Sequence, residues 1–198
     1  MQLLIATYNP GKLIEIQDLL KNIPVELVTP ADLHFHIHSE ENGSTYEQNA
    51  TIKARALCSL SKVATLADDS GLEVEQLNGK PGIFSARFSN SPHAEDADRR
   101  RLLLTQLQEK PRPWAARFVC AVALAVPQDE IFTSRGECVG EIIPDERGTN
   151  GFGYDPIFLF PQIGKTMAEL SLKEKNRISH RAQAIRNILP KIQEHLLL

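Results

Sequence analysis

The chain has 198 residues, 42% of them hydrophobic and 24% charged, which is the composition of an ordinary soluble globular protein with a substantial core. Its formal net charge of -3 argues against a general nucleic-acid or membrane-surface binder, because such proteins are basic. No stretch is long and apolar enough for a membrane span or a signal sequence. Cys58, Cys120 and Cys138 lie far apart in apolar settings, so we expect buried reduced thiols and a cytoplasmic location. We find no repeat or linker and predict one domain over residues 1–198.

The chain opens with a predicted strand at residues 2–6 and a predicted helix after it. The segment between them, Thr7-Tyr8-Asn9-Pro10-Gly11-Lys12, supplies Asn9 as N-cap and Pro10 as the first helical residue. A helix start reached through such a turn favours anions, because free backbone N–H groups point there. Lys12 opposes the helix dipole and makes sense if an anion binds at this position. The segment is not a Walker A loop, and a surface lysine after a capped turn stays open as the alternative.

Three segments precede the most informative stretch. Residues 25–28 predict a second strand, and the alternation over residues 33–38 predicts a strand whose histidines form a polar face and not a metal site. Ser44-Thr45-Tyr46-Glu47 predicts a capping box, which opens a helix that runs to about Leu60. Lys53 on this helix faces either solvent or a phosphate.

Two adjacent acids, Asp68 and Asp69, interrupt the apolar stretch at residues 63–75. We predict that a buried strand ends at these carboxylates, where open α/β sheets keep their ligand crevices. Asp-Asp-Ser-Gly also suits a solvated turn, and this stretch alone does not decide between the turn and a site.

The second half of the chain predicts an irregular segment at residues 81–88 and a helix from Ser91-Pro92 to about Gln108. A central strand is predicted at residues 115–126, and one or two strands at residues 131–143. Further along, Ser171-Leu172-Lys173-Glu174 predicts a second capping box.

Three glycines alternate with Phe152 and Tyr154 in residues 148–156. A backbone of this kind approaches a ligand closely, and a planar base can stack on the rings, although aromatic core packing explains the same residues. His180 and Arg181 open the last predicted helix, where the dipole disfavours cations. The guanidinium fork suits the O6 and N7 acceptors of a 6-keto purine.

Five motifs occur in order between residues 6 and 181: A-T-Y-N-P-G-K, A-D-D-S-G-L, P-G-I-F-S-A-R-F, G-F-G-Y-D-P and S-H-R. Together they resemble the inosine/xanthosine triphosphate pyrophosphatase family. The resemblance implies an α/β fold, with an elongated mixed β-sheet, flanking helices and two lobes around a central nucleotide cleft, in a homodimer. It also implies magnesium-dependent hydrolysis of ITP, dITP and XTP to the monophosphate and pyrophosphate, which keeps these nucleotides out of DNA and RNA.

The resemblance further implies roles for individual residues. Asp69 is the general base and a magnesium ligand, and Glu40 is the second metal ligand, with Glu41 as its alternative. The remaining residues implied to bind the substrate are Thr7, Tyr8, Asn9, Pro10, Gly11, Lys12, Lys53, Asp68 and Ser70 around the phosphates, Phe152, Gly153, Tyr154 and Asp155 at the base and ribose, and Lys175, His180 and Arg181 at the purine edge.

Two rival hypotheses stay open from the sequence. The first is a related pyrophosphatase for pyrimidine or modified nucleotides, against which the S-H-R motif argues. The second is a regulatory protein that binds a nucleotide without hydrolysing it, although a mere binder gains nothing from carboxylates near phosphates. In all cases the partner is a small molecule, with neither nucleic acid nor membrane involved.

Overall fold

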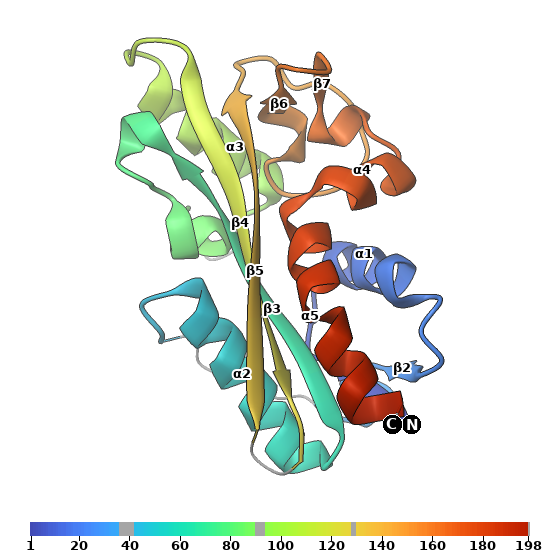
Figure 1. Cartoon of the computed structure of the whole chain (residues 1–198). Helices are drawn as coiled ribbons and strands as arrows, with labels where there is room; N and C mark the ends of the chain where they lie inside the picture. The colour runs from blue at the N-terminus through green and yellow to red at the C-terminus, as the bar shows by residue number, and fades with distance from the viewer. Residues whose placement is uncertain (36–41, 90–93, 128–129, 198) are drawn as a thin grey trace. The chain divides into compact units, whose positions relative to one another are not determined.

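The computed structural model describes residues 1–35, 42–89, 94–127 and 130–197. Within these residues, seven strands form one sheet in the order β2-β1-β3-β4-β5-β6-β7 (Figure 1). The strands are β1 (Gln2–Ile5), β2 (Glu26–Val28), β3 (Ala64–Val74), β4 (Trp114–Ala125), β5 (Ile131–Ile142), β6 (Phe158–Phe160) and β7 (Lys165–Thr166). The α-helices are α1 (Pro10–Leu20), α2 (Tyr46–Ser61), α3 (Asp96–Leu107), α4 (Leu172–Ile178) and α5 (His180–Leu197). Short 3-10 helices are η1 (Glu75–Leu77), η2 (Gly82–Arg87), η3 (Asp155–Ile157) and η4 (Met167–Glu169).

The sheet is mixed. β1 pairs in parallel with both β2 and β3, whereas β6 pairs antiparallel with β5 and β7. The predicted α/β class with a mixed sheet and flanking helices is therefore confirmed. None of the described helices is long and apolar enough to cross a bilayer.

Contacts divide the chain into two compact units. Unit 1 comprises Met1–Asp69, Cys120–Gly136 and His180–Leu198, and unit 2 comprises Ser70–Val119 and Glu137–Ser179. β3, β4 and β5 each contribute residues to both units, with the division in β3 falling between Asp69 and Ser70.

Unit 1 has helices on both faces of its part of the sheet (Figure 1). Side chains of a strand alternate between faces, so Leu3 and Ile5 pack on α1 and α5 while Leu4 packs on α2. The buried stripe of α2 contains Ala50, Ala54, Leu57 and Cys58, whereas Leu60 is exposed.

Unit 2 has its own apolar core. Leu103 and Leu107 of α3 are fully buried and pack in a cluster with Leu72 of β3, Phe118 of β4 and Phe158 of β6. All three cysteines of the chain are buried and free, as predicted.

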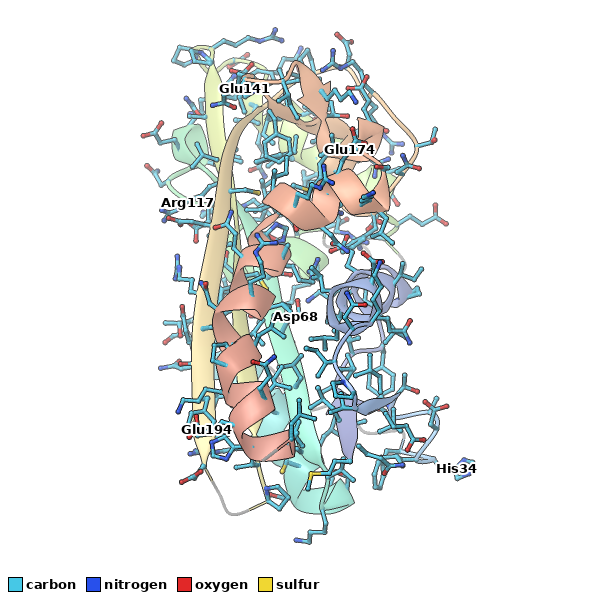
Figure 2. All side chains as sticks on the ribbon, turned by 45° about the vertical axis from the view of Figure 1, so that its right-hand side comes forward. His34, Asp68, Arg117, Glu141, Glu174 and Glu194 are labelled. Atoms are coloured by element: carbon cyan, nitrogen blue, oxygen red, sulfur yellow. The ribbon has the colours of Figure 1, made fainter. Side chains whose placement is uncertain are left out.

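Three sequence predictions are wrong. β3 does not end at the acids but continues through Asp68, Asp69, Ser70 and Gly71, so the alternative of a solvated turn at these residues is also wrong. Residues 33–35 form no strand: Asp32 Oδ2 accepts the Thr29 N–H at 2.8 Å and fixes a turn. The exposed His34 within it has a φ of 58° and points outward (Figure 2); residues 36–38 lie outside the described residues.

The third wrong prediction is the start of α3. The helix begins at Asp96, because Glu95 and Asp98 form a reciprocal capping box there. The predicted start, Ser91-Pro92, lies outside the described residues. The predicted Asn9 cap of α1 is confirmed, as is the Ser171–Glu174 box of α4, and α2 is capped one residue later than predicted, by Thr45.

Candidate active site

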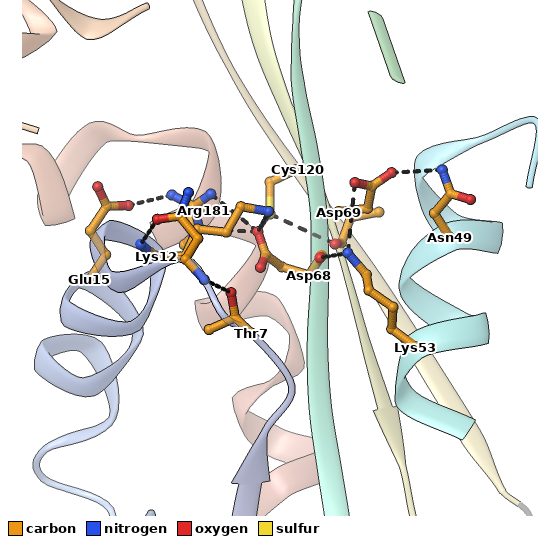
Figure 3. A network of polar contacts seen from close by, with 11 residues as sticks. Thr7, Lys12, Glu15, Asn49, Lys53, Asp68, Asp69, Cys120 and Arg181 are labelled. Atoms are coloured by element: carbon orange, nitrogen blue, oxygen red, sulfur yellow. Dashed lines mark hydrogen bonds and ion pairs between the residues drawn. The ribbon is translucent and has the colours of Figure 1, made fainter. Parts of the chain in front are cut away.

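Asp68 and Asp69 point to opposite faces of the sheet. They are consecutive residues in the middle of β3, and successive side chains of a strand alternate between its faces. Asp68 faces α1 and α5, and Asp69 faces α2 (Figure 3). The two carboxylates therefore have separate environments within unit 1.

Asp68 is the centre of a buried network of charges. Its Oδ2 atom lies 3.0 Å from Lys12 Nζ and accepts hydrogen bonds from Arg181 Nε and Nη2 at 3.2 and 3.1 Å. The Cys120 Sγ lies 3.9 Å from the same oxygen. Arg181 Nη1 in turn donates to Glu15, which is also buried. The carboxylates of Asp68 and Glu15 thus lie beside the cations of Lys12 and Arg181 in the interior.

This network keeps Asp68 ionised. Burial alone would raise the pKa of Asp68, but the charges of Lys12, Arg181 and Lys53 outweigh it and hold that pKa well below its usual range. Burial would also lower the pKa of Arg181, but Glu15 and Asp68 raise it. The thiol of Cys120 stays neutral, because burial and the charge of Asp68 raise its pKa.

The same network explains the two cations that begin helices. Lys12 lies in the first turn of α1 and Arg181 in the first turn of α5, and each has a carboxylate of the protein as its partner. The unfavourable interaction with the helix dipole is therefore compensated inside the fold. Contrary to the sequence argument, these positions do not by themselves require a bound anion.

Asp69 is held by a different set of groups. Its Oδ2 accepts a hydrogen bond from Asn49 Nδ2 at 3.0 Å, and its Oδ1 lies 3.8 Å from Lys53 Nζ. Lys53 Nζ also donates to the backbone carbonyl of Asp68 at 2.5 Å. Asn49 is completely buried, and its own Oδ1 accepts the N–H of Gly43 at 2.9 Å, which fixes which end of the amide faces Asp69.

The segment between β1 and α1 provides further polar groups. Asn9 Oδ1 accepts the backbone N–H of Lys12 at 3.1 Å, and Thr7 Oγ1 accepts that of Asn9 at 3.2 Å. Tyr8 is half exposed, and its hydroxyl donates to the carbonyl of Phe35 at 3.2 Å. Pro10 and Gly11 form the first turn of the helix. The predicted arrangement of strand, turn and helix start is confirmed.

The aromatic segment (residues 152–155) lies in unit 2 and is tied together by Asp155. The Asp155 Oδ2 accepts the N–H of Phe152 at 3.0 Å and pairs with Lys175 Nζ at 2.5 Å. Lys175 Nζ lies 4.9 Å from the centre of the Phe152 ring. Burial raises the pKa of Tyr154, so its hydroxyl stays protonated and donates to the carbonyl of Ser85 at 2.9 Å.

The predicted residues thus gather in two groups. Lys12, Lys53, Asp68, Asp69 and Arg181 interact within unit 1, together with the segment that begins at Thr7. Phe152, Asp155 and Lys175 interact within unit 2. Ser70 is half-buried in β3, and His180 is buried at the start of α5. Glu40 and its alternative Glu41 lie outside the described residues.

Sequence reasoning missed Glu15, Asn49 and Cys120 as partners of the acids. Asn49 was detectable, because it precedes Lys53 by one helical turn on α2 and therefore shares its face. The sequence indicated Glu15 only weakly, as a charged residue next to the apolar positions of α1. Across the part of the chain that the structure describes, no group of three or more His, Cys, Asp or Glu side chains is arranged to hold a metal ion.

The structure thus defines an α/β protein with a lysine in the first turn of the helix that follows β1 and two acids in the middle of β3. The sequence profile of the Ham1 family matches residues 3–191, and the chain belongs to this family. A dITP/XTP pyrophosphatase of Exiguobacterium sibiricum is 43% identical over 189 residues, or 95% of each chain.

Two solved structures agree with this assignment. A HAM1 protein of Coxiella burnetii is 38% identical and superposes with a TM-score of 0.88, covering 98% of this chain and 99% of the other. A nucleoside-triphosphatase, or dITP/XTP pyrophosphatase, of Mycobacterium abscessus is 42% identical with a TM-score of 0.76, covering 96% and 100%. The family predicted from the five motifs is confirmed.

Proposed function

We propose that this protein is a dITP/XTP pyrophosphatase, which hydrolyses deaminated purine nucleoside triphosphates to the monophosphate and pyrophosphate. The proposal rests above all on Asp69, a mid-strand carboxylate with one oxygen held by Asn49 and the other close to Lys53. The relatives named as dITP/XTP pyrophosphatases support the choice of substrate, since they match nearly the whole chain.

Asp69 is the proposed general base. With its carboxylate oriented by Asn49 and close to Lys53, Asp69 would orient a water molecule and take its proton during attack on the α-phosphorus. The triphosphate would lie over Thr7–Lys12, where Lys12 and Lys53 bind it and neutralise the charge that develops on the leaving pyrophosphate.

Magnesium is the proposed metal, and the residues fit it. Magnesium prefers hard oxygen ligands and binds through one or two carboxylates plus substrate phosphates. Asp69 supplies such a carboxylate on the face of β3 that lies against α2, whereas Asp68 points to the other face. When bound, the ion would polarise the phosphate oxygens. Glu40 stays a predicted ligand.

We assign the binding of base and ribose to Phe152, Gly153, Tyr154 and Asp155, and a further contact with the substrate to Ser70. Hypoxanthine and xanthine carry an acceptor at position 6 where adenine carries a donor, so donors from Lys175, His180 and Arg181 would discriminate between them. Arg181 is engaged by Glu15 and Asp68 and would have to exchange one of these partners for the base. The cleft between lobes, the homodimer and the cytoplasmic location also stay predictions.

The experiment that tests this function measures release of pyrophosphate from dITP, ITP, XTP, GTP, ATP and dTTP in the presence of magnesium. We expect the highest kcat/KM for dITP, ITP and XTP. Asp69→Asn should lower kcat by about 10²–10⁴-fold, the usual contribution of a general base. Glu73→Gln is the matched control, because Glu73 lies on the same strand and pairs with Arg117.

Each rival hypothesis has its own outcome. A preference for dTTP would keep the phosphate chemistry and reject the purine assignment. Binding of all six nucleotides without hydrolysis would favour a regulatory binding protein, and full activity of Asp69→Asn would remove this residue from the role of base.

A further inference from the structure

The start of α3 holds both backbone polar groups of Gly153, within unit 2. Asp96 Oδ2 accepts the Gly153 N–H at 2.7 Å, and Arg100 Nη1 donates to the Gly153 carbonyl oxygen at 2.8 Å. Asp96 and Arg100 are one helical turn apart, so their side chains leave the same face of α3. The helix therefore holds the aromatic segment at its second residue.

Asp96 and Arg100, which we call the Gly153 clamp, are themselves held in place. Arg100 Nε and Nη2 donate to the two carboxylate oxygens of Glu146 at 2.8 and 2.9 Å, which is a bidentate pair. Asp96 Oδ1 pairs with Arg99 at 2.5 Å. Burial would raise the pKa of Asp96, but hydrogen bonds from Arg99 and Gly153 lower it, so the acid is charged. Such charge-assisted hydrogen bonds are roughly twice as strong as neutral ones.

Gly153 lies in open space on the side where a side chain would be. Its φ is +61°, in the left-handed region that glycine enters readily, and a β-carbon built on it would meet nothing within 4 Å. Packing of a side chain therefore does not position this residue. Its neighbours are anchored separately, Phe152 through its N–H to Asp155 and Tyr154 through its hydroxyl to Ser85.

We propose that Asp96 and Arg100 are positioning residues that preform the backbone at Gly153 and thereby set the base selectivity of this enzyme. The inference rests on the proposed function, because it takes the aromatic segment as the part that contacts base and ribose. Neither residue touches the reacting atoms. A preformed segment does not have to be ordered when the nucleotide binds, so the clamp contributes to binding and discrimination, while the chemical step depends on Asp69.

The first test compares kcat and KM for dITP, dGTP and dATP in Arg100→Met, which keeps the apolar stem and loses the donors. We expect a rise in KM for dITP on the order of tenfold, as for a lost charged hydrogen bond, with nearly unchanged kcat and a smaller preference for dITP. Asp96→Asn should give the same pattern more weakly, and Arg100→Lys should restore part of the loss.

Arg101→Met is the matched control. Arg101 is the next residue, its side chain is 75% exposed, and it pairs with Asp98 of its own helix. It should behave as the unmodified protein. Unchanged KM and selectivity in Arg100→Met would overturn the proposal, and so would an equal loss of kcat for all nucleotides accompanied by a lower Tm, since that pattern indicates a purely structural role.

The second test does not depend on activity. Hydrogen exchange of the Gly153 amide should be slow in the unmodified protein and in Arg101→Met, and clearly faster in Asp96→Asn. Equal exchange rates would reject the clamp whatever the enzyme hydrolyses. If the unmodified protein shows no preference for dITP while the Gly153 amide is protected, the proposed function fails and the clamp stands without its role in selectivity.

Discussion

Arg181 directs two of its nitrogen atoms at one oxygen of Asp68, with Nε at 3.2 Å and Nη2 at 3.1 Å, across 113 residues of sequence. The third contact of the guanidinium group, from Nη1, goes to Glu15 on α1. Helix α5, strand β3 and helix α1 are therefore joined by one buried arginine. The arrangement leads to two predictions, one about stability and one about the base.

Removal of Asp68 should destabilise the protein strongly. Asp68→Ala leaves two buried cations, Lys12 and Arg181, with Glu15 as the one remaining carboxylate of the network, and breaking a buried pair in this way costs about 3–5 kcal/mol. The free energy of unfolding in urea measures the effect. Glu194→Ala is the matched control, because its partner Lys191 is exposed, and such surface pairs contribute little. If Asp68→Ala and Glu194→Ala lower the free energy of unfolding equally, Asp68 is not the centre of the buried charge network.

Arg181→Ala separates two roles of this arginine. If Arg181 exchanges a carboxylate for the base, the ratio of kcat/KM for dITP over dATP should fall by about tenfold or more. If it only holds Asp68, all nucleotides should lose activity together and the ratio should stay constant. We expect the first result. The measurement needs a parallel value of Tm, since loss of the guanidinium group also leaves Glu15 and Asp68 without their shared partner.

The parts of the fold that follow local rules were predictable from the sequence. Asn9 and Ser171 cap their helices as expected, because a cap depends on residues within one turn. β3 was predicted to end at Asp68 because Ser70-Gly71 suits a turn. The sheet overrides that preference: β3 pairs with β1 over residues 64–66 and has the long strand β4 as its other neighbour, and it continues to Val74.

The partners of the site residues were not predictable in the same way. Glu15 meets Arg181 across 166 residues of sequence, and no local pattern indicates that contact. The acids were found because two charges in an apolar stretch are unusual. Their separation onto opposite faces follows only when the strand is known to continue through both of them.

Asn49→Ala should slow catalysis with little change in KM. Asn49 fixes one oxygen of Asp69, and loss of a hydrogen bond that orients such a ligand or base costs about 10–100-fold. The measurement is kcat for dITP at saturating magnesium, with Tm determined in parallel. Gln48→Ala is the control, since this neighbour is exposed and its side-chain oxygen bonds Ser44, away from Asp69. An unchanged kcat would show that Asp69 is positioned by other groups.

The capping box of α4 should make stability depend on pH in a defined window. The Ser171 hydroxyl, the Ser171 N–H and Lys165 lower the pKa of Glu174 from 4.5 to about 2. A folded-state pKa below the unfolded value stabilises the protein fully above pH 4.5, and this contribution is lost as the pH falls from 4.5 towards 2. Glu174→Gln keeps an acceptor but removes the charge, so the difference in Tm between the two proteins should shrink across that window. Other carboxylates titrate in both proteins and cancel in the difference. If the difference in Tm stays constant as the pH falls from neutral through this window, the charge of Glu174 does not stabilise α4.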